Sequence, residues 1–232
     1  MSIRKIPILN SEYYHVYNRG NSKQKIFLDE EDYLRFVKLL YLCNSDEKIN
    51  FRTDITEKGI DAWNFERGKT LVSIGSWVLM PNHFHLYITG SRSLASGEHN
   101  NAIIVFVQKL STAYAKYFNA KHSHTGSLFE GKFKAVHVKD DIQSKYLISY
   151  IHLNPMKLIQ PDWKENGIKD FKLALNFLSS YRWSSFNYYK GKELQENAII
   201  NSKDFPNYFD KNEDFEKEIF EWFSRSLASG NL

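Results

Sequence analysis

The chain has 232 residues but a single cysteine, Cys43. One cysteine excludes an intramolecular disulfide, and it cannot supply the several thiolates of a structural zinc site. The lack of disulfides is typical of a reducing compartment, and residues 1–10 lack the apolar core of a signal peptide. We therefore expect a cytoplasmic protein.

Long apolar runs are absent too, since no stretch of about 18 apolar residues occurs that could form a membrane-spanning helix. The chain has no internal repeat and no low-complexity tract. Hydrophobic residues make up 42% of it and aromatic residues 16%. This composition predicts one folded domain with extensions, because 232 residues are enough to bury a sizeable core.

The excess of positive charge is small, with a formal net charge of +4 and an isoelectric point near 8.9. The charge is unevenly spread. Residues 101–160 carry eight lysines, no arginine and three acidic residues, whereas residues 201–232 carry four basic and seven acidic residues. The middle of the chain is therefore the better partner for nucleic-acid phosphates, and the net charge alone does not decide the matter.

The hydrophobic periodicity predicts seven regular elements up to residue 155. Strands are expected at residues 13–17, 70–80, 83–89 and 133–138, and helices at residues 29–43, 101–119 and 140–154. The first six elements follow the order strand, helix, strand, strand, helix, strand. This order predicts an α+β fold of the ferredoxin-like type, an antiparallel sheet with helices on one face.

Two regions fall outside this pattern. Residues 44–69 are polar and contain two glycines, which indicates an irregular insertion with a short strand. Residues 161–232 have the pattern of a helical and irregular extension. We expect a catalytic domain at residues 1–160 and a C-terminal extension at 161–232 packed on the same domain.

Two histidines, His83 and His85, stand two positions apart in a predicted strand. Residues i and i+2 of a strand point to the same face, so the two imidazoles form a ready pair of metal ligands. Together with an amide oxygen and open positions, such a pair fits Mg²⁺ or Mn²⁺. The alternative is a pair of structural histidines on a half-exposed strand.

A tyrosine and an asparagine, Tyr150 and Asn154, stand four positions apart near the end of a predicted helix and share one face. A phenol with an ordinary pKa near 10 is a poor nucleophile, but a divalent ion can polarise a phosphate for attack. Tyr150 is then the candidate nucleophile and Asn154 the candidate third ligand. The alternative is a packed tyrosine followed by an asparagine at a helix end, before Pro155. Tyr114, Tyr117 and Tyr146 compete for the nucleophile's role.

Five separated segments resemble the REP-associated tyrosine transposases, single-tyrosine transposases with an HUH motif. They are residues 14–20 (YHVYNRG), 77–85 (WVLMPNHFH), 126–134 (GSLFEGKFK), 150–157 (YIHLNPMK) and 183–185 (WSS). The coincidence of five segments in the family's order, over residues 12–190, makes the resemblance specific.

The resemblance implies cleavage and rejoining of single-stranded DNA beside a palindromic hairpin, through a 5′-phosphotyrosine intermediate. Carried over to this chain, it makes Tyr150 the nucleophile and His83, His85 and Asn154 the ligands of Mg²⁺ or Mn²⁺. It also favours a monomer over a homodimer that exchanges its tyrosine helix. The insertion at residues 44–69 departs from the family pattern.

The phosphate contacts are expected from basic residues near these segments, namely Arg19, Lys132, Lys134, Lys139 and Lys157. Lys132 and Lys134 stand where relatives often have arginine, and lysine binds phosphate only as a point charge. For each of the five, the alternative is a solvated surface charge.

Two other functions remain open from the sequence. The first is a domesticated relative that binds DNA hairpins without cutting them. The second is a replication or relaxation initiator of the wider HUH class, against which the lack of a phosphate-cradling helicase loop argues.

Overall fold

The computed structural model describes residues 8–92, 101–209 and 212–225. Its centre is a four-stranded antiparallel sheet with the strand order β2-β3-β1-β4. The strands are β1 (Tyr13–Arg19), β2 (Val72–Met80), β3 (His83–Gly90) and β4 (Lys134–Val138). With the helices α1 (Glu30–Leu42) and α2 (Ala102–His122), they form the predicted βαββαβ unit. The α+β, ferredoxin-like prediction is confirmed.

Short polar side chains fix where the helices begin. The carboxylate of Asp29 accepts a hydrogen bond from the backbone of Asp32 at the start of α1. Asp140 does the same for Gln143 at the start of α3 (Asp141–Leu153). These caps satisfy amides that have no partner within the helix, so the helices start where the sequence predicted.

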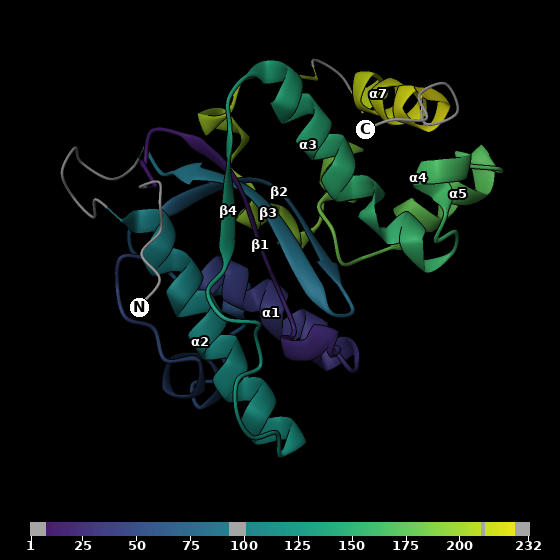
Figure 1. Ribbon diagram of the computed structural model, residues 1–232. Helices are drawn as coiled ribbons and strands as arrows, with labels where there is room; N and C mark the ends of the chain where they lie inside the picture. The colour runs from purple at the N-terminus through teal and green to yellow at the C-terminus, as the bar shows by residue number, and fades with distance from the viewer. Residues whose placement is uncertain (1–7, 93–100, 210–211, 226–232) are drawn as a thin grey trace.

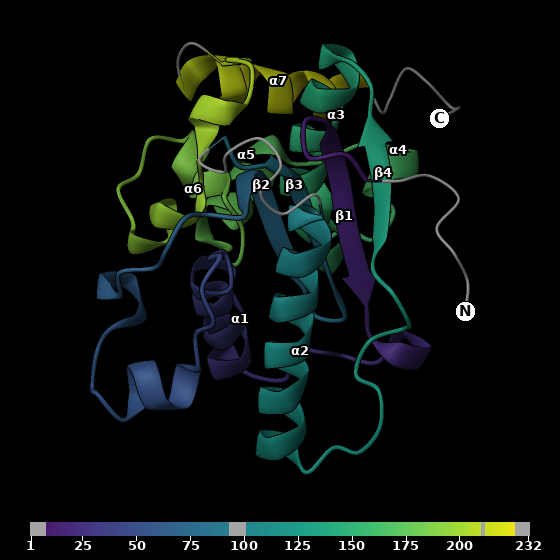
Figure 2. The ribbon, with the colours of Figure 1, turned by 90° about the vertical axis from the view of Figure 1, so that its left-hand side faces the viewer.

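The sheet lies between two helical layers (Figures 1 and 2). The helices α1 and α2 cover one face, as predicted for the ferredoxin-like unit. Alternate strand residues point to this side, and Val16 and Phe84 pack there with Phe36 and Phe106. This face is closed by apolar packing, so the polar residues of β1 and β3 that alternate with these must point the other way.

The opposite face carries α3 and the C-terminal extension. Val78 and Tyr87 of the sheet pack there with Ile151 of α3 and with Phe186 and Phe215 of the extension. The extension contains α4 (Trp163–Asn166), α5 (Phe171–Ser180), α6 (Phe186–Tyr189) and α7 (Asn212–Arg225). Short 3-10 turns occupy Asn21–Lys23, Ala62–Asn64, Asn154–Leu158, Gln195–Ile199 and Ser202–Asp204.

The extension is joined to the outer strand β2 by backbone hydrogen bonds. The amide of Leu79 donates to the Trp183 carbonyl at 2.9 Å, and the amide of Ser185 donates to the Trp77 carbonyl at 3.0 Å. Residues 183–185 thus cover the free edge of the sheet, which would otherwise present unpaired donors and acceptors. Among the described residues, no helix has the length and apolar character needed to cross a membrane.

The insertion at residues 44–69 folds as helical turns and not with the short strand expected from its sequence. A π-helical turn spans Phe51–Thr56, and the Asn50 side chain accepts a hydrogen bond from the Arg52 amide at its start. Leu42 of α1 packs with Ile55 and Ala62 of the insertion. The short polar caps compete with strand pairing, so local hydrogen bonding decides the structure here. The insertion therefore packs on α1. It belongs to the helical layer on the sheet face opposite to the one that α3 covers.

Candidate metal and nucleophile site

The predicted histidine pair lies on the sheet face covered by α3. His83 and His85 alternate with the buried Phe84, and their ring centroids are 4.9 Å apart. On the neighbouring strand β1, His15 and Tyr17 point to the same face, because Tyr17 is the direct partner of His85 in the sheet. The His15 and His85 rings are stacked with centroids 4.9 Å apart. Three imidazoles therefore gather at this place.

In each of the two predicted imidazole ligands, Nδ1 lies within hydrogen-bond distance of another side chain. His83 Nδ1 lies 2.6 Å from Asn82 Oδ1, and His85 Nδ1 lies 2.8 Å from His15 Nε2. The Nε2 atoms of His83 and His85 are then the nitrogens that could bind a metal ion. Such partners fix the tautomer and the orientation of metal-binding imidazoles.

Burial keeps these imidazoles neutral near pH 7. It lowers the pKa of His15 and of His83 from 6.5 to about 4. For His83 the charge of Lys157 adds to the effect, and an interaction with the Asn154 amide partly opposes it. Burial, and then the neighbouring imidazoles and lysines, hold the pKa of His85 well below its usual value. Only a neutral imidazole has the lone pair that a metal ion requires.

The helix α3 brings Tyr150 and Asn154 to the same place. The ring centroid of Tyr150 lies 5.6 Å from that of His85 and 5.9 Å from that of His15. Asn154 follows one turn later and is 1% exposed. Its Nδ2 donates to the Tyr150 carbonyl at 3.4 Å, whereas its buried Oδ1 has no hydrogen-bond partner among the described residues.

This set of donors fits a divalent cation. Two imidazole nitrogens and one amide oxygen are ligands for borderline or hard divalent ions, with open positions left for water and phosphate. The unsatisfied Asn154 Oδ1 is the strongest sign, because a buried carbonyl oxygen without a partner costs about 1–3 kcal/mol. A cation bound beside His83 and His85 would remove that cost.

The competing tyrosines differ from Tyr150 in their surroundings. Tyr114 is fully buried, and its hydroxyl donates to the Ile26 carbonyl. Tyr117 bonds Asp32, in the helical layer on the other face. Tyr146 is exposed one turn before Tyr150 and stacks on it with ring centroids 6.1 Å apart. Of the four, Tyr150 alone has ring contacts to both His15 and His85.

The five basic residues predicted to contact DNA are all exposed, but they are not equivalent. Arg19 is already paired with Glu130, which raises the pKa of the guanidinium and lowers that of the carboxyl. Lys134 stands on the same sheet face as the imidazoles, with Nζ 6.0 Å from the Tyr17 ring centroid. Lys157 is near enough to lower the pKa of both His83 and His85. Lys132 and Lys139 flank β4 at its two ends.

A second cluster of possible metal ligands lies in the other layer. Ligand atoms of Asp29, Asp32 and His122 all lie within 4.8 Å of one another. Lys121 already occupies this cluster, with its ammonium 2.8 Å from Asp29 and 3.1 Å from Asp32. An ammonium held by several carboxylates takes the place that a cation would have, so this is an ion-pair network.

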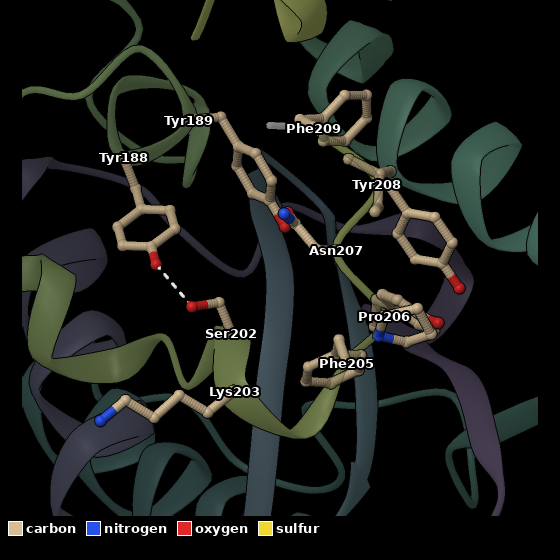
Figure 3. A pocket seen from close by; sticks show the side chains of 11 residues that line it. Tyr188, Tyr189, Ser202, Lys203, Phe205, Pro206, Asn207, Tyr208 and Phe209 are labelled. Atoms are coloured by element: carbon tan, nitrogen blue, oxygen red, sulfur yellow. Dashed lines mark hydrogen bonds between the residues drawn. The ribbon is translucent and has the colours of Figure 1, made fainter. Parts of the chain in front are cut away.

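A cavity of about 550 Å³ lies between α3 and the segment that follows Ser202 (Figure 3). Aromatic side chains line much of it, and the Tyr188 hydroxyl donates to Ser202 Oγ at 3.0 Å. None of the predicted site residues lines this cavity. Ile148 reaches it from the side of α3 that faces away from Tyr150, so the cavity and the imidazole site are separated by the helix.

The comparisons with known proteins found similarity only to solved structures. No family model matches the sequence, and no curated protein matches it. A solved REP-associated tyrosine transposase bound to a REP hairpin shares 15% identity, with a TM-score of 0.47, over 84% of this chain and 90% of that one. The chain is similar to REP-associated tyrosine transposases. A proposed transposase of Deinococcus radiodurans R1 shares 14% identity, with a TM-score of 0.32, over 63% of this chain and 92% of that one.

Sequence reasoning missed two residues that border Tyr150. His15 lies in the first of the transposase-like segments, but only the pairing of β1 with β3 brings it to His85. Lys164 belongs to the extension, and its Nζ lies 4.4 Å from the centroid of the Tyr150 ring. The alternation of β1 could have placed His15 on a face. No local signal in the sequence pointed to Lys164.

The WSS segment connects the tyrosine helix to the sheet through His152. Ser185 Oγ accepts from the Trp77 amide at 2.9 Å and lies 2.8 Å from His152 Nε2. His152 is fully buried among aromatic rings, two residues after Tyr150. Through Ser185, this link joins α3 to strand β2 of the same chain. The predicted preference for a monomer stays a prediction.

We expect His152 to make the folded chain less stable in acid. Burial lowers its pKa from 6.5 to about 3. Between these values the unfolded chain binds a proton that the folded chain does not, so stability is complete above pH 6.5 and falls as the pH decreases. The loss is about 1.4 kcal/mol per pH unit. His152→Gln keeps a polar atom near Ser185 and should remove the part of the pH dependence of stability that comes from His152.

The measurement is the free energy of urea unfolding at pH 7.5 and pH 5.0. The wild type should lose roughly 2 kcal/mol more than His152→Gln over this interval. His15 and His83 contribute in both proteins, so the difference isolates His152. An equal loss in the two proteins would contradict the prediction.

Proposed function

We propose that the chain is a metal-dependent single-stranded DNA endonuclease and strand transferase that acts through Tyr150. The observation that carries the proposal is the meeting of four groups, two imidazoles of strand β3 with a phenol and an amide from the distant helix α3 and its end. The Tyr150 ring touches the imidazoles, and Asn154 presents an unsatisfied oxygen beside them. A purely structural site would satisfy that oxygen, which is why the arrangement favours a site for chemistry.

The reaction we propose is a transesterification at phosphorus. The Tyr150 hydroxyl oxygen forms a bond to the phosphorus of a DNA phosphodiester and releases its proton to water. The bond from phosphorus to the 3′ oxygen breaks, and that oxygen takes a proton to leave a free 3′-hydroxyl. The product is a 5′-phosphotyrosine, which conserves the ester so that another 3′-hydroxyl can reverse the step.

His83, His85 and Asn154 would hold a divalent ion, Mg²⁺ or Mn²⁺. When bound, such an ion neutralises charge on the phosphate in the transition state. The protein's own part is to keep the imidazoles neutral and oriented, which burial and the partners Asn82 and His15 support. The short link from Tyr150 to Asn154 couples the nucleophile to this set through one helical turn.

We propose single-stranded DNA beside a palindromic hairpin as the substrate, on the strength of the five transposase-like segments. Lys134 and Lys157 border the site and are the predicted phosphate contacts that are best placed. Arg19 stays a predicted contact, although a phosphate would have to compete with Glu130 for it. Binding should weaken as salt is added, because released counterions supply much of the free energy.

The test is the formation of a covalent complex. Purified protein, a labelled hairpin oligonucleotide with a single-stranded 5′ extension, and Mn²⁺ should give a protein–DNA adduct that survives denaturing electrophoresis. Mass spectrometry should locate the nucleotide on Tyr150, and omission of the metal should prevent its formation. Tight binding with no adduct, across several metals and sequences, would instead favour the domesticated hairpin-binding protein.

A further inference from the structure

Lys164 lies against the proposed nucleophile although it belongs to the C-terminal extension. Its Nζ is 4.4 Å from the centroid of the Tyr150 ring, a distance typical of a cation–π contact. The adjacent Trp163 is 4% exposed and packs in the core with Ile151 of α3. An anchored neighbour therefore fixes the backbone from which Lys164 reaches over Tyr150.

Besides its contacts with the Tyr150 and Trp163 rings, the charge of Lys164 has no carboxylate partner among the described residues. The residue is exposed, yet burial of its ammonium against the site lowers its pKa, and the positive charge of Lys157 lowers it further. Glu165 opposes these effects, but no salt bridge to Lys164 or Lys157 occurs among the described residues. Two like charges near each other in a partly desolvated place repel, and an anion between them would relieve the repulsion.

Other basic residues of the chain show the contrast. Arg19 is paired with Glu130 through two nitrogen–oxygen contacts. Lys121 is bound by three carboxylates. Lys164 instead points its charge at a phenol and at the imidazole site, since it also lowers the pKa of His85. The Lys164 ammonium therefore lies where an anion bound beside Tyr150 would contact it.

We propose that Lys164 is a further catalytic residue, whose ammonium binds a non-bridging oxygen of the phosphodiester that Tyr150 attacks. This rests on the proposed function. The ammonium keeps all its protons. It offsets the negative charge that grows on the non-bridging oxygens while the bond from Tyr150 to phosphorus forms and the bond to the 3′ oxygen breaks. The extension then supplies part of the active site and does more than cover the sheet.

The first measurement is the single-turnover rate of adduct formation with the hairpin oligonucleotide and Mn²⁺. Lys164→Met should slow it on the order of 100-fold, the usual effect of losing one group that stabilises a transition-state oxyanion. Lys164→Arg should recover most of the rate. Mn²⁺ affinity should not fall in Lys164→Met, because the change removes a positive charge that acts on His85. Lys172→Met, at an exposed lysine of α5, is the matched control and should react like the wild type.

The second measurement needs no cleavage. In a Tyr150→Phe background, which keeps the ring, the dependence of DNA affinity on salt is compared with and without Lys164→Met. Loss of one phosphate contact should reduce the slope of log affinity against log salt by about 0.7. An unchanged slope, or a wild-type cleavage rate for Lys164→Met, overturns the proposal for Lys164. An absent adduct in the wild type, with a reduced slope, overturns the proposed function and supports the phosphate contact.

Discussion

Replacing Tyr150 by phenylalanine is expected to abolish the covalent protein–DNA adduct, a loss of at least about 1,000-fold in cleavage. Phenylalanine keeps the ring that contacts His15, His85 and Lys164 but lacks the oxygen that would bond to phosphorus. Hairpin DNA should still bind, because the lysines around the site are unchanged. The measurement is adduct formation on denaturing gels beside a binding assay with the same labelled DNA.

Tyr146 supplies the matched control for this experiment. It is an exposed tyrosine on the same helix, stacked on Tyr150 and one turn further from Asn154. Tyr146→Phe should retain adduct formation within about tenfold. An adduct that persists in Tyr150→Phe would show that another residue is the nucleophile. If adduct formation were lost in Tyr146→Phe and retained in Tyr150→Phe, Tyr146 would be the nucleophile.

Removing either predicted histidine ligand is expected to have the second large effect. His83→Ala and His85→Ala should each weaken Mn²⁺ binding by more than about 100-fold, since losing a ligand costs at least as much as losing the partner that orients it. Cleavage should fall below detection, while hairpin binding stays within about twofold. Calorimetry or Mn²⁺ electron paramagnetic resonance measures the metal separately from activity.

The control histidine is His122, which lies in the ion-pair network around Lys121. His122→Ala should leave Mn²⁺ affinity unchanged if the metal binds at His83 and His85. A loss of Mn²⁺ affinity in His122→Ala, with no loss in His83→Ala, would place the metal at the acidic cluster instead. Asn154→Asp offers a further comparison, because it adds a charge to the proposed third ligand and should tighten Mn²⁺ binding.

Much of the fold could be predicted because it depends on patterns of neighbouring residues in the sequence. The β-branched and aromatic residues of β1, the alternation along β4 and the aspartates before α1 and α3 act within a few residues, and they indicated the order and type of these elements. The insertion was harder. Its turns depend on caps such as Asn50 and on a small apolar contact with α1, which propensity does not report.

The sequence by itself determined the pairs that are close along the chain: His83 with His85, two positions apart on a strand, and Tyr150 with Asn154, one helical turn apart. Spacing alone puts such residues on a common face. Only the tertiary structure decided that the two pairs meet, and that His15 and Lys164 join them. Strand pairing and the path of the extension bring these residues together, and both depend on burial of apolar surface between segments far apart in the chain.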